Sequence, residues 1–186
     1  AMTEELFAAC KKKMDDSLDH LRKELSKLRT GCANTAILEG LTVDYYGTPT
    51  PLSQVATLGT PDNQTITIQP WDTSILKDLE KVILGSDLGL TPSNDGKVIR
   101  LNIPPLTGER RQQLVKVVKK YVEDHKVAIR NVRRHFNDEF KSKEKKHEIS
   151  EDVSHKGQDR LQKITDEHIT TADKLAQEKE KDILNV

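Results

Sequence analysis

The chain has few cysteines and no long apolar run. Its two cysteines, Cys10 and Cys32, form no CxxC motif and have no histidine at metal-ligand spacing, so we expect a reducing compartment and no structural disulfide. No segment reaches the ~18 apolar residues of a membrane-spanning helix. No signal-type stretch is visible, and we interpret Ala1 before Met2 as a cloning remnant. These absences predict a cytoplasmic protein without a membrane partner.

Motifs that carry chemistry are also missing. The sequence has no GxxxxGK[ST] phosphate loop, no GxGxxG and no HExxH. None of its six histidines stands in a ligand pattern with cysteine or with another histidine. His125 and His168 lie on apolar helical stripes, where a packed, hydrogen-bonded histidine is expected. We therefore predict no catalytic residue, no cofactor, no metal and no small-molecule substrate.

What the chain has in abundance is segregated charge. Charged residues make up 32% of it and the formal net charge is zero. Residues 108–146 nevertheless carry thirteen Lys and Arg against six Asp and Glu, a net of +7, whereas residues 31–105 and 147–186 each carry −4. This segregation has two interpretations: a polyanion binds the basic segment, or basic and acidic helices neutralise each other within a bundle.

The segment from Thr107 to Lys146 predicts one long helix. It contains no proline, and its apolar residues recur at spacings of three and four, forming the stripe Leu114, Val118, Tyr121, Val122, His125, Ile129, Val132, Phe136 and Phe140.

Two further helices are predicted, over residues 3–29 and from Ser150 onward. The first has a near-coiled-coil stripe and Gly31 as its expected C-cap; the stripe is Phe7, Cys10, Met14, Leu18, Leu21, Leu25 and Leu28. The last has Ser150 as its N-cap and a thinner stripe, namely Val153, Leu161, Ile164, His168, Ala172, Leu175 and Ile183. Three amphipathic helices can bury one another as a bundle, and we expect a monomer.

Residues 31–105 differ from the helical segments in composition and pattern. All seven prolines lie here, between short β-type runs at Leu41–Tyr46, Val55–Leu58, Thr65–Gln69 and Val98–Ile103. A helix is predicted from Asp72 to Leu84. The fold class is therefore α+β: a long three-helix bundle with an inserted small β/α/β domain. The two chain segments that join them, near Gly31 and near Pro104-Pro105, predict a hinge.

The basic side of the long helix is the candidate binding surface. Lys126, Arg130, Arg133 and Arg134 lie close together on it, and arginine binds phosphate oxygens in a bidentate manner. Tyr121, Phe136 and Phe140 belong to the core stripe and so offer no stacking platform. This favours backbone contacts with folded RNA over sequence reading.

Several blocks across the whole chain resemble the ribosome recycling factor family. The most specific is the run from Val43 to Leu52, VDYYGTPTPL. Other blocks lie in the same order as in the family: LRTG at 28–31, SDLGL at 86–90, IPPLT at 103–107 with ERR at 109–111, VAIRNVRR at 127–134, and Lys146 with EISED at 148–152. The sequence departs from the family at Cys32, where arginine is usual, and at His135-Phe136-Asn137, where Asp-Ala-Asn is usual.

The resemblance implies a non-enzymatic, L-shaped protein that works with elongation factor G and GTP. Together they would split the post-termination ribosome and release messenger RNA and deacylated transfer RNA. Residues 1–30 and 106–186 would form the bundle, which binds ribosomal RNA of the large subunit, and residues 31–105 the domain that faces elongation factor G. The expected RNA-binding set is Arg29, Arg110, Lys126, Arg130, Arg133 and Arg134. The expected hinge set is Thr30, Gly31, Cys32, Pro104 and Pro105.

Two alternatives remain open. The bundle could be a helical protein–protein interaction module without a ribosomal role, in which case charge reversal at Arg130 and Arg133 should be tolerated. An enzymatic role would need a ligand-dependent change in melting temperature to support it.

Overall fold

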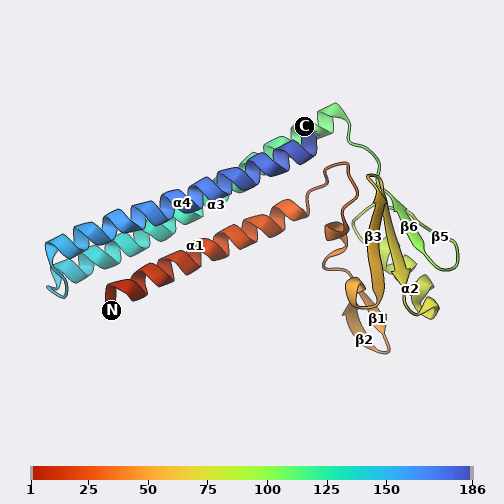
Figure 1. Ribbon diagram of the computed structural model, residues 1–186, viewed down its shortest axis with the longest axis horizontal. Coiled ribbons are helices and arrows are strands. Elements are labelled where there is room, and N and C mark those ends of the chain that lie inside the picture. The colour runs from red at the N-terminus through yellow and green to blue at the C-terminus, as the bar shows by residue number, and fades with distance from the viewer. Residues whose placement is uncertain (1, 185–186) are drawn as a thin grey trace. The chain divides into compact units, whose positions relative to one another are not determined.

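The computed structural model describes residues 2–184, so Ala1 lies outside the described residues. The chain divides into two compact units (Figure 1). One comprises the residues up to Leu25 together with those from Gln112 onward, and the other is Ser26–Arg111. This division assigns both connecting segments to the smaller unit, whereas the sequence-based boundaries lie at residues 30/31 and 105/106.

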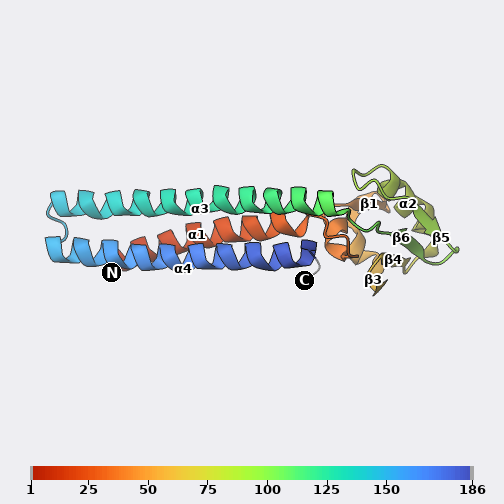
Figure 2. The same cartoon turned by 90° about the horizontal axis from the view of Figure 1, so that it is seen from above.

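The larger unit is built from three long helices, α1 (Met2–Ser26), α3 (Gly108–Lys145) and α4 (Glu151–Leu184). They lie side by side in both views (Figures 1 and 2). Phe7 near the start of α1 lies beside Phe140 at the end of α3, while Glu4 and Asp15 of α1 contact Arg160 and His168 of α4 in the same order along both helices. Helices α1 and α4 therefore run in the same direction, with α3 antiparallel to both. The predicted three-helix bundle is confirmed.

The helical stripes build the bundle core largely as predicted. Six of the seven stripe residues of the first helix are buried, from Phe7 to Leu25, as are seven of the nine in α3; Tyr121 and Val132 are half-buried. The end of α1 differs from the expectation. This helix stops at Ser26, so Leu28 and Arg29 lie beyond it, and Gly31 belongs to the following link instead of capping the helix.

Helix α4 presents a different face near its start than its apolar residues suggest. Ser150 caps it as predicted, because its Oγ accepts from the Val153 N–H at 3.1 Å. Val153 is 40% exposed, however, while Ser154 and Gly157 are buried. A Cβ on Gly157 would meet the Phe140 ring, 2.7 Å from Cδ1 and 2.8 Å from Cζ. The small residues face the core here because the large ring of α3 occupies the space.

Two buried histidines tie the bundle helices together. His125 of α3 lies 2.9 Å from Ser17 Oγ through Nδ1 and 2.7 Å from Glu24 Oε1 through Nε2. His168 of α4 lies 2.7 Å from the Ile164 carbonyl and 2.7 Å from Asp15 Oδ1. Both are packed and hydrogen-bonded, as their positions on the stripes predict.

The smaller unit contains a hairpin, a four-stranded sheet and one helix. The hairpin pairs β1 (Thr42–Tyr45) with β2 (Thr48–Pro51). The antiparallel sheet has the order β3-β4-β6-β5, and its strands are β3 (Ala56–Asp62), β4 (Thr65–Pro70), β5 (Pro92–Asn94) and β6 (Ile99–Asn102). Helix α2 (Leu76–Leu84) follows a short 3-10 turn at Thr73–Ile75, which Asp72 caps. Its buried side chains Leu76, Leu79 and Ile83 join Ile66, Ile68, Ile99 and Leu101 in one apolar core.

Two of the strands are not predicted by the sequence pattern. Strand β2 contains Pro49 and Pro51, and strand β5 begins at Pro92. Proline cannot donate a ladder hydrogen bond, which argues against a central strand. Both strands are edge strands, each paired on one side only, where proline is tolerated.

Candidate nucleic-acid interface

Three arginines of α3 lie off its buried stripe. The buried residues Val122, Ile129 and Phe136 fix the rotation of the helix, so Arg130 and Arg134 fall on its outer side and Arg133 lies at the margin of the buried face. Arg130 and Arg134 are exposed and Arg133 is half-buried. We refer to these three residues as the arginine face.

The arginines of this face form no ion pairs with the acidic helix α4. Arg130 Nη1 lies 3.7 Å from Glu123 Oε1, and Arg134 Nη1 donates to Asn131 Oδ1 at 3.4 Å; both partners belong to α3 itself. Arg133 has no hydrogen bond or ion pair within residues 2–184. Exposed pairs of this kind are weak, so the guanidinium groups can exchange them for phosphate oxygens.

Lys126 has a different environment. Its ammonium forms an ion pair with Asp173 of α4, and its side chain is only 17% exposed. Mutual neutralisation between the basic and acidic helices therefore holds at Lys126 but does not extend to the arginine face. The two interpretations of the charge segregation apply to different residues of the same helix.

Arg29 and Arg110 belong to the smaller unit. Arg29 is half-buried and, together with Lys27, Glu39 and Asp87, lines a surface groove of about 300 Å³. Arg110 is exposed in the first turn of α3, where its N–H donates to Thr107 Oγ1 at 3.1 Å. The RNA-binding roles assigned to Arg29 and Arg110 remain predictions.

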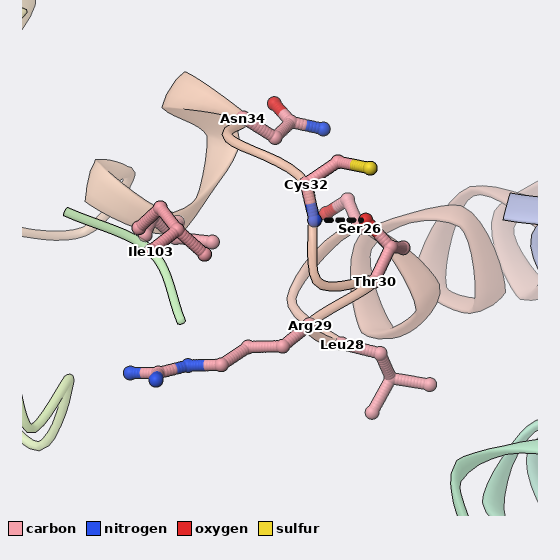
Figure 3. A pocket seen from close by; sticks show the side chains of 8 residues that line it. Ser26, Leu28, Arg29, Thr30, Cys32, Asn34 and Ile103 are labelled. Carbon is pink, nitrogen blue, oxygen red and sulfur yellow. Dashed lines mark hydrogen bonds between the residues drawn. The ribbon is translucent and has the colours of Figure 1, made fainter. Parts of the chain in front are cut away.

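The first connecting segment is shown in Figure 3. The Cys32 N–H donates to Thr30 Oγ1 at 3.4 Å, and Arg29 and Leu28 extend in different directions from the chain. Together with Ser26, Asn34, Ile37 and Ile103 these residues line a small cavity. Gly31 has a φ of +79°, and a Cβ there would lie 3.1 Å from Leu106 Cγ and from Leu106 N. The two segments thus approach each other within the smaller unit, and only glycine fits the approach without strain.

Replacing Gly31 with alanine should destabilise the smaller unit by about 2 kcal/mol, because an L residue at positive φ costs roughly 1–2 kcal/mol and Leu106 must also move. Denaturant unfolding followed by fluorescence of Trp71, the single tryptophan, reports on this unit. Gly40→Ala is the matched control, since its φ is +88° with no atom within 4 Å of the added Cβ. Equal losses for the two variants would contradict a role for the Leu106 contact.

The structure also brings together residues that sequence spacing did not identify. His20 and Glu24 of α1 meet His125 of α3, although no histidine stands in a ligand pattern along the chain. The spacing of four between His20 and Glu24 was visible, but the third residue comes from a helix a hundred residues away. Two exposed aromatic side chains of the smaller unit, Tyr46 (83% exposed) and Trp71 (66% exposed), were likewise not singled out. None of the helices within residues 2–184 contains an apolar stretch that could span a membrane.

Comparison with known proteins identifies relatives along the full chain. Residues 21–184 match the family model described as ribosome recycling factor. The ribosome-recycling factor of Solidesulfovibrio magneticus is 56% identical over 174 residues, 94% of this chain and 95% of that protein. The one from Geobacillus sp. (strain WCH70) is 52% identical over 185 residues, 100% of both chains.

Solved structures give the same result. A solution structure of a ribosome recycling factor is 38% identical with a TM-score of 0.83, covering 100% of this chain and 99% of that one. A second match is a chain from models of the Thermus thermophilus ribosome recycling factor and Escherichia coli elongation factor G bound to the E. coli post-termination complex. It is 48% identical with a TM-score of 0.69, and 98% of each chain is covered.

Proposed function

The chain belongs to the ribosome recycling factor family, and we propose on that basis that it splits the post-termination ribosome together with elongation factor G and GTP. Ribosomes are thereby freed of messenger RNA and deacylated transfer RNA for reuse. The protein is not an enzyme; its contribution is binding and mechanical, and its partner hydrolyses the nucleotide. This work takes place in the cytoplasm, where the ribosomes are.

The observation that carries the proposal is the arginine face of α3. Arg130, Arg133 and Arg134 have no partner on α4 and lie on a rigid helix, which presents their guanidinium groups at fixed spacing to the phosphates of folded ribosomal RNA. Lys126 contributes less, since Asp173 already neutralises it. Arg29 matches an RNA-contacting arginine of the family by position, and we also include Arg110 in the RNA-binding set.

The inserted domain takes the second role. We assign residues 31–105, with their net charge of −4, to contact with elongation factor G. The connecting segments around Thr30, Gly31 and Cys32 and around Pro104 and Pro105 act as the hinge. They contain neither helix nor strand, so rotation there breaks no ladder of backbone hydrogen bonds. A force applied to the small domain is then transmitted to the RNA-bound bundle, which breaks bridges between the subunits.

Subunit dissociation tests the proposal. Post-termination bacterial ribosomes are mixed with this protein, elongation factor G and GTP, and separated subunits are measured by light scattering while each component is omitted in turn. We expect dissociation only in the complete mixture, at a rate comparable with that of a known recycling factor run in parallel. Intact ribosomes in the complete mixture would favour the alternative of a helical protein-binding module.

A further inference from the structure

We propose that His20, Glu24 and His125 form a binding site for a zinc-class divalent transition-metal ion, which would link α1 to α3. Two imidazole groups converge on a single carboxylate oxygen: Glu24 Oε1 lies 3.1 Å from His20 Nδ1 and 2.7 Å from His125 Nε2. One ligand atom from each of the three residues falls within 4.8 Å of the other two. This site is independent of the arginine face and of the proposed ribosomal role.

The distances fit a metal after a small adjustment. Zinc binds imidazole nitrogen at about 2.0–2.1 Å and carboxylate oxygen at about 2.0–2.2 Å, so the ligand atoms of a tetrahedral site are roughly 3.3 Å apart. His125 is held in the core with its side chain 11% exposed, whereas the side chains of His20 and Glu24 are 69% and 28% exposed. Around Glu24 Oε1 the two contacts must lengthen by roughly 0.2–0.6 Å, and the two imidazole nitrogens, which lie within 4.8 Å of each other, must take up a spacing of about 3.3 Å; the exposed side chains of His20 and Glu24 can make this adjustment.

Ser17 suits the change in hydrogen bonding that binding requires. Its Oγ lies 2.9 Å from His125 Nδ1. Without an ion, the tautomer of His125 with its proton on Nε2 donates to Glu24 and accepts at Nδ1 from the Ser17 hydroxyl. With an ion on the Nε2 lone pair, the ring proton moves to Nδ1 and donates to Ser17 Oγ, because a hydroxyl can play either part. A hydrogen bond to the second nitrogen is the usual way in which a metal-binding histidine is oriented.

The donor set selects the class of ion. Two imidazole nitrogens with one carboxylate favour zinc and its neighbours over magnesium or calcium, which prefer ligands made only of oxygen. The exposure of His20 leaves room for water as the fourth ligand. The chain also supplies matched comparisons: His135 with Glu139 (3.8 Å) and His155 with Glu151 (3.5 Å) have the same spacing of four, but within residues 2–184 they gather no third ligand.

The test is titration of the full chain, stripped of metal with a chelator, with Zn²⁺ by calorimetry, and with Co²⁺ by its visible absorption. We expect one saturable site, a melting temperature that rises with Zn²⁺, and affinity at least tenfold lower in His20→Gln and Glu24→Gln. His20→Gln alters an exposed side chain, and its metal-free melting temperature shows whether the fold is kept. His155→Gln and Cys32→Ser should bind as the parent does.

Three results would overturn the proposal. The first is the absence of saturable binding to the parent protein. The second is unchanged affinity in His20→Gln, which would leave the cluster as an ordinary histidine–carboxylate contact. The third is loss of binding in Cys32→Ser, which would locate the ion at a thiol.

Discussion

Replacing Arg130 and Arg133 together with alanine is expected to weaken binding to the large ribosomal subunit on the order of 100-fold, since a hydrogen bond to a charged group contributes about 1.5–3 kcal/mol. The dependence of log K on log salt should also become shallower by about 1.4–1.8, because fewer counterions are released. Binding measured from 50 to 300 mM salt gives both quantities. The stability of the bundle should change little, because Arg130 is exposed and the half-buried Arg133 has no hydrogen bond or ion pair within residues 2–184 to lose.

Two controls separate specific contacts from net charge. Lys156→Ala combined with Lys163→Ala removes the same charge from exposed positions of α4 and should cost much less affinity. Lys126→Ala removes a cation that Asp173 neutralises, so it should change the salt slope less than loss of one arginine. If the α4 double variant lost as much affinity as the arginine variant, the assignment of the arginine face would be wrong.

Replacing Gly157 with alanine is expected to lower the melting temperature of the bundle by about 8–16 °C. The added methyl group would overlap the Phe140 ring, which is fully buried and has no room to withdraw. Overpacking of this kind costs about 3 kcal/mol at its upper end, and the better helix propensity of alanine returns up to about 1 kcal/mol, leaving roughly 2 kcal/mol. Thermal unfolding followed by helical circular dichroism measures the effect.

A second variant identifies the cause of that loss. Phe140→Leu opens space beside residue 157, so the double variant should be more stable than the sum of the two single changes predicts. Gly108→Ala is the control for helix propensity, because no atom lies within 4 Å of a Cβ at the start of α3. A Gly157→Ala protein as stable as the parent would show that Phe140 can move.

The sequence predicted much of this architecture because its main signals are periodic. The stripes from Phe7 to Leu25 and from Leu114 to Phe140 fix both the helices and their buried faces. The register of α4 near its start was wrong, however. Val153 is more apolar than Ser154 or Gly157, but the choice of face depends on the volume of Phe140, which lies on another helix. The edge strands β2 and β5 were not predicted because proline normally argues against a strand.

Contacts between different helices could not be predicted from the sequence, and the candidate sites depend on them. Spacing could place Lys126, Arg130 and Arg133 on one side of α3. It could not show that Asp173 pairs with the first of them and leaves the other two available. The same limit applies to His125, whose approach to His20 and Glu24 is a property of packed helices and has no pattern within any one of them.

The insertion of the small domain between α1 and α3 has a consequence for the order of folding. Helices α3 and α4 are joined by a short turn and can pair at little entropic cost, but α1 meets them only across large separations, such as 101 residues from Glu24 to His125. Closing so long a flexible loop is slow. Once the domain has folded, its entering and leaving segments lie close together at Gly31 and Leu106. The folded domain then shortens the effective loop between α1 and the α3–α4 hairpin, which should speed their association. Variants that destabilise the small domain should therefore slow folding of the bundle even where they leave the bundle core unchanged.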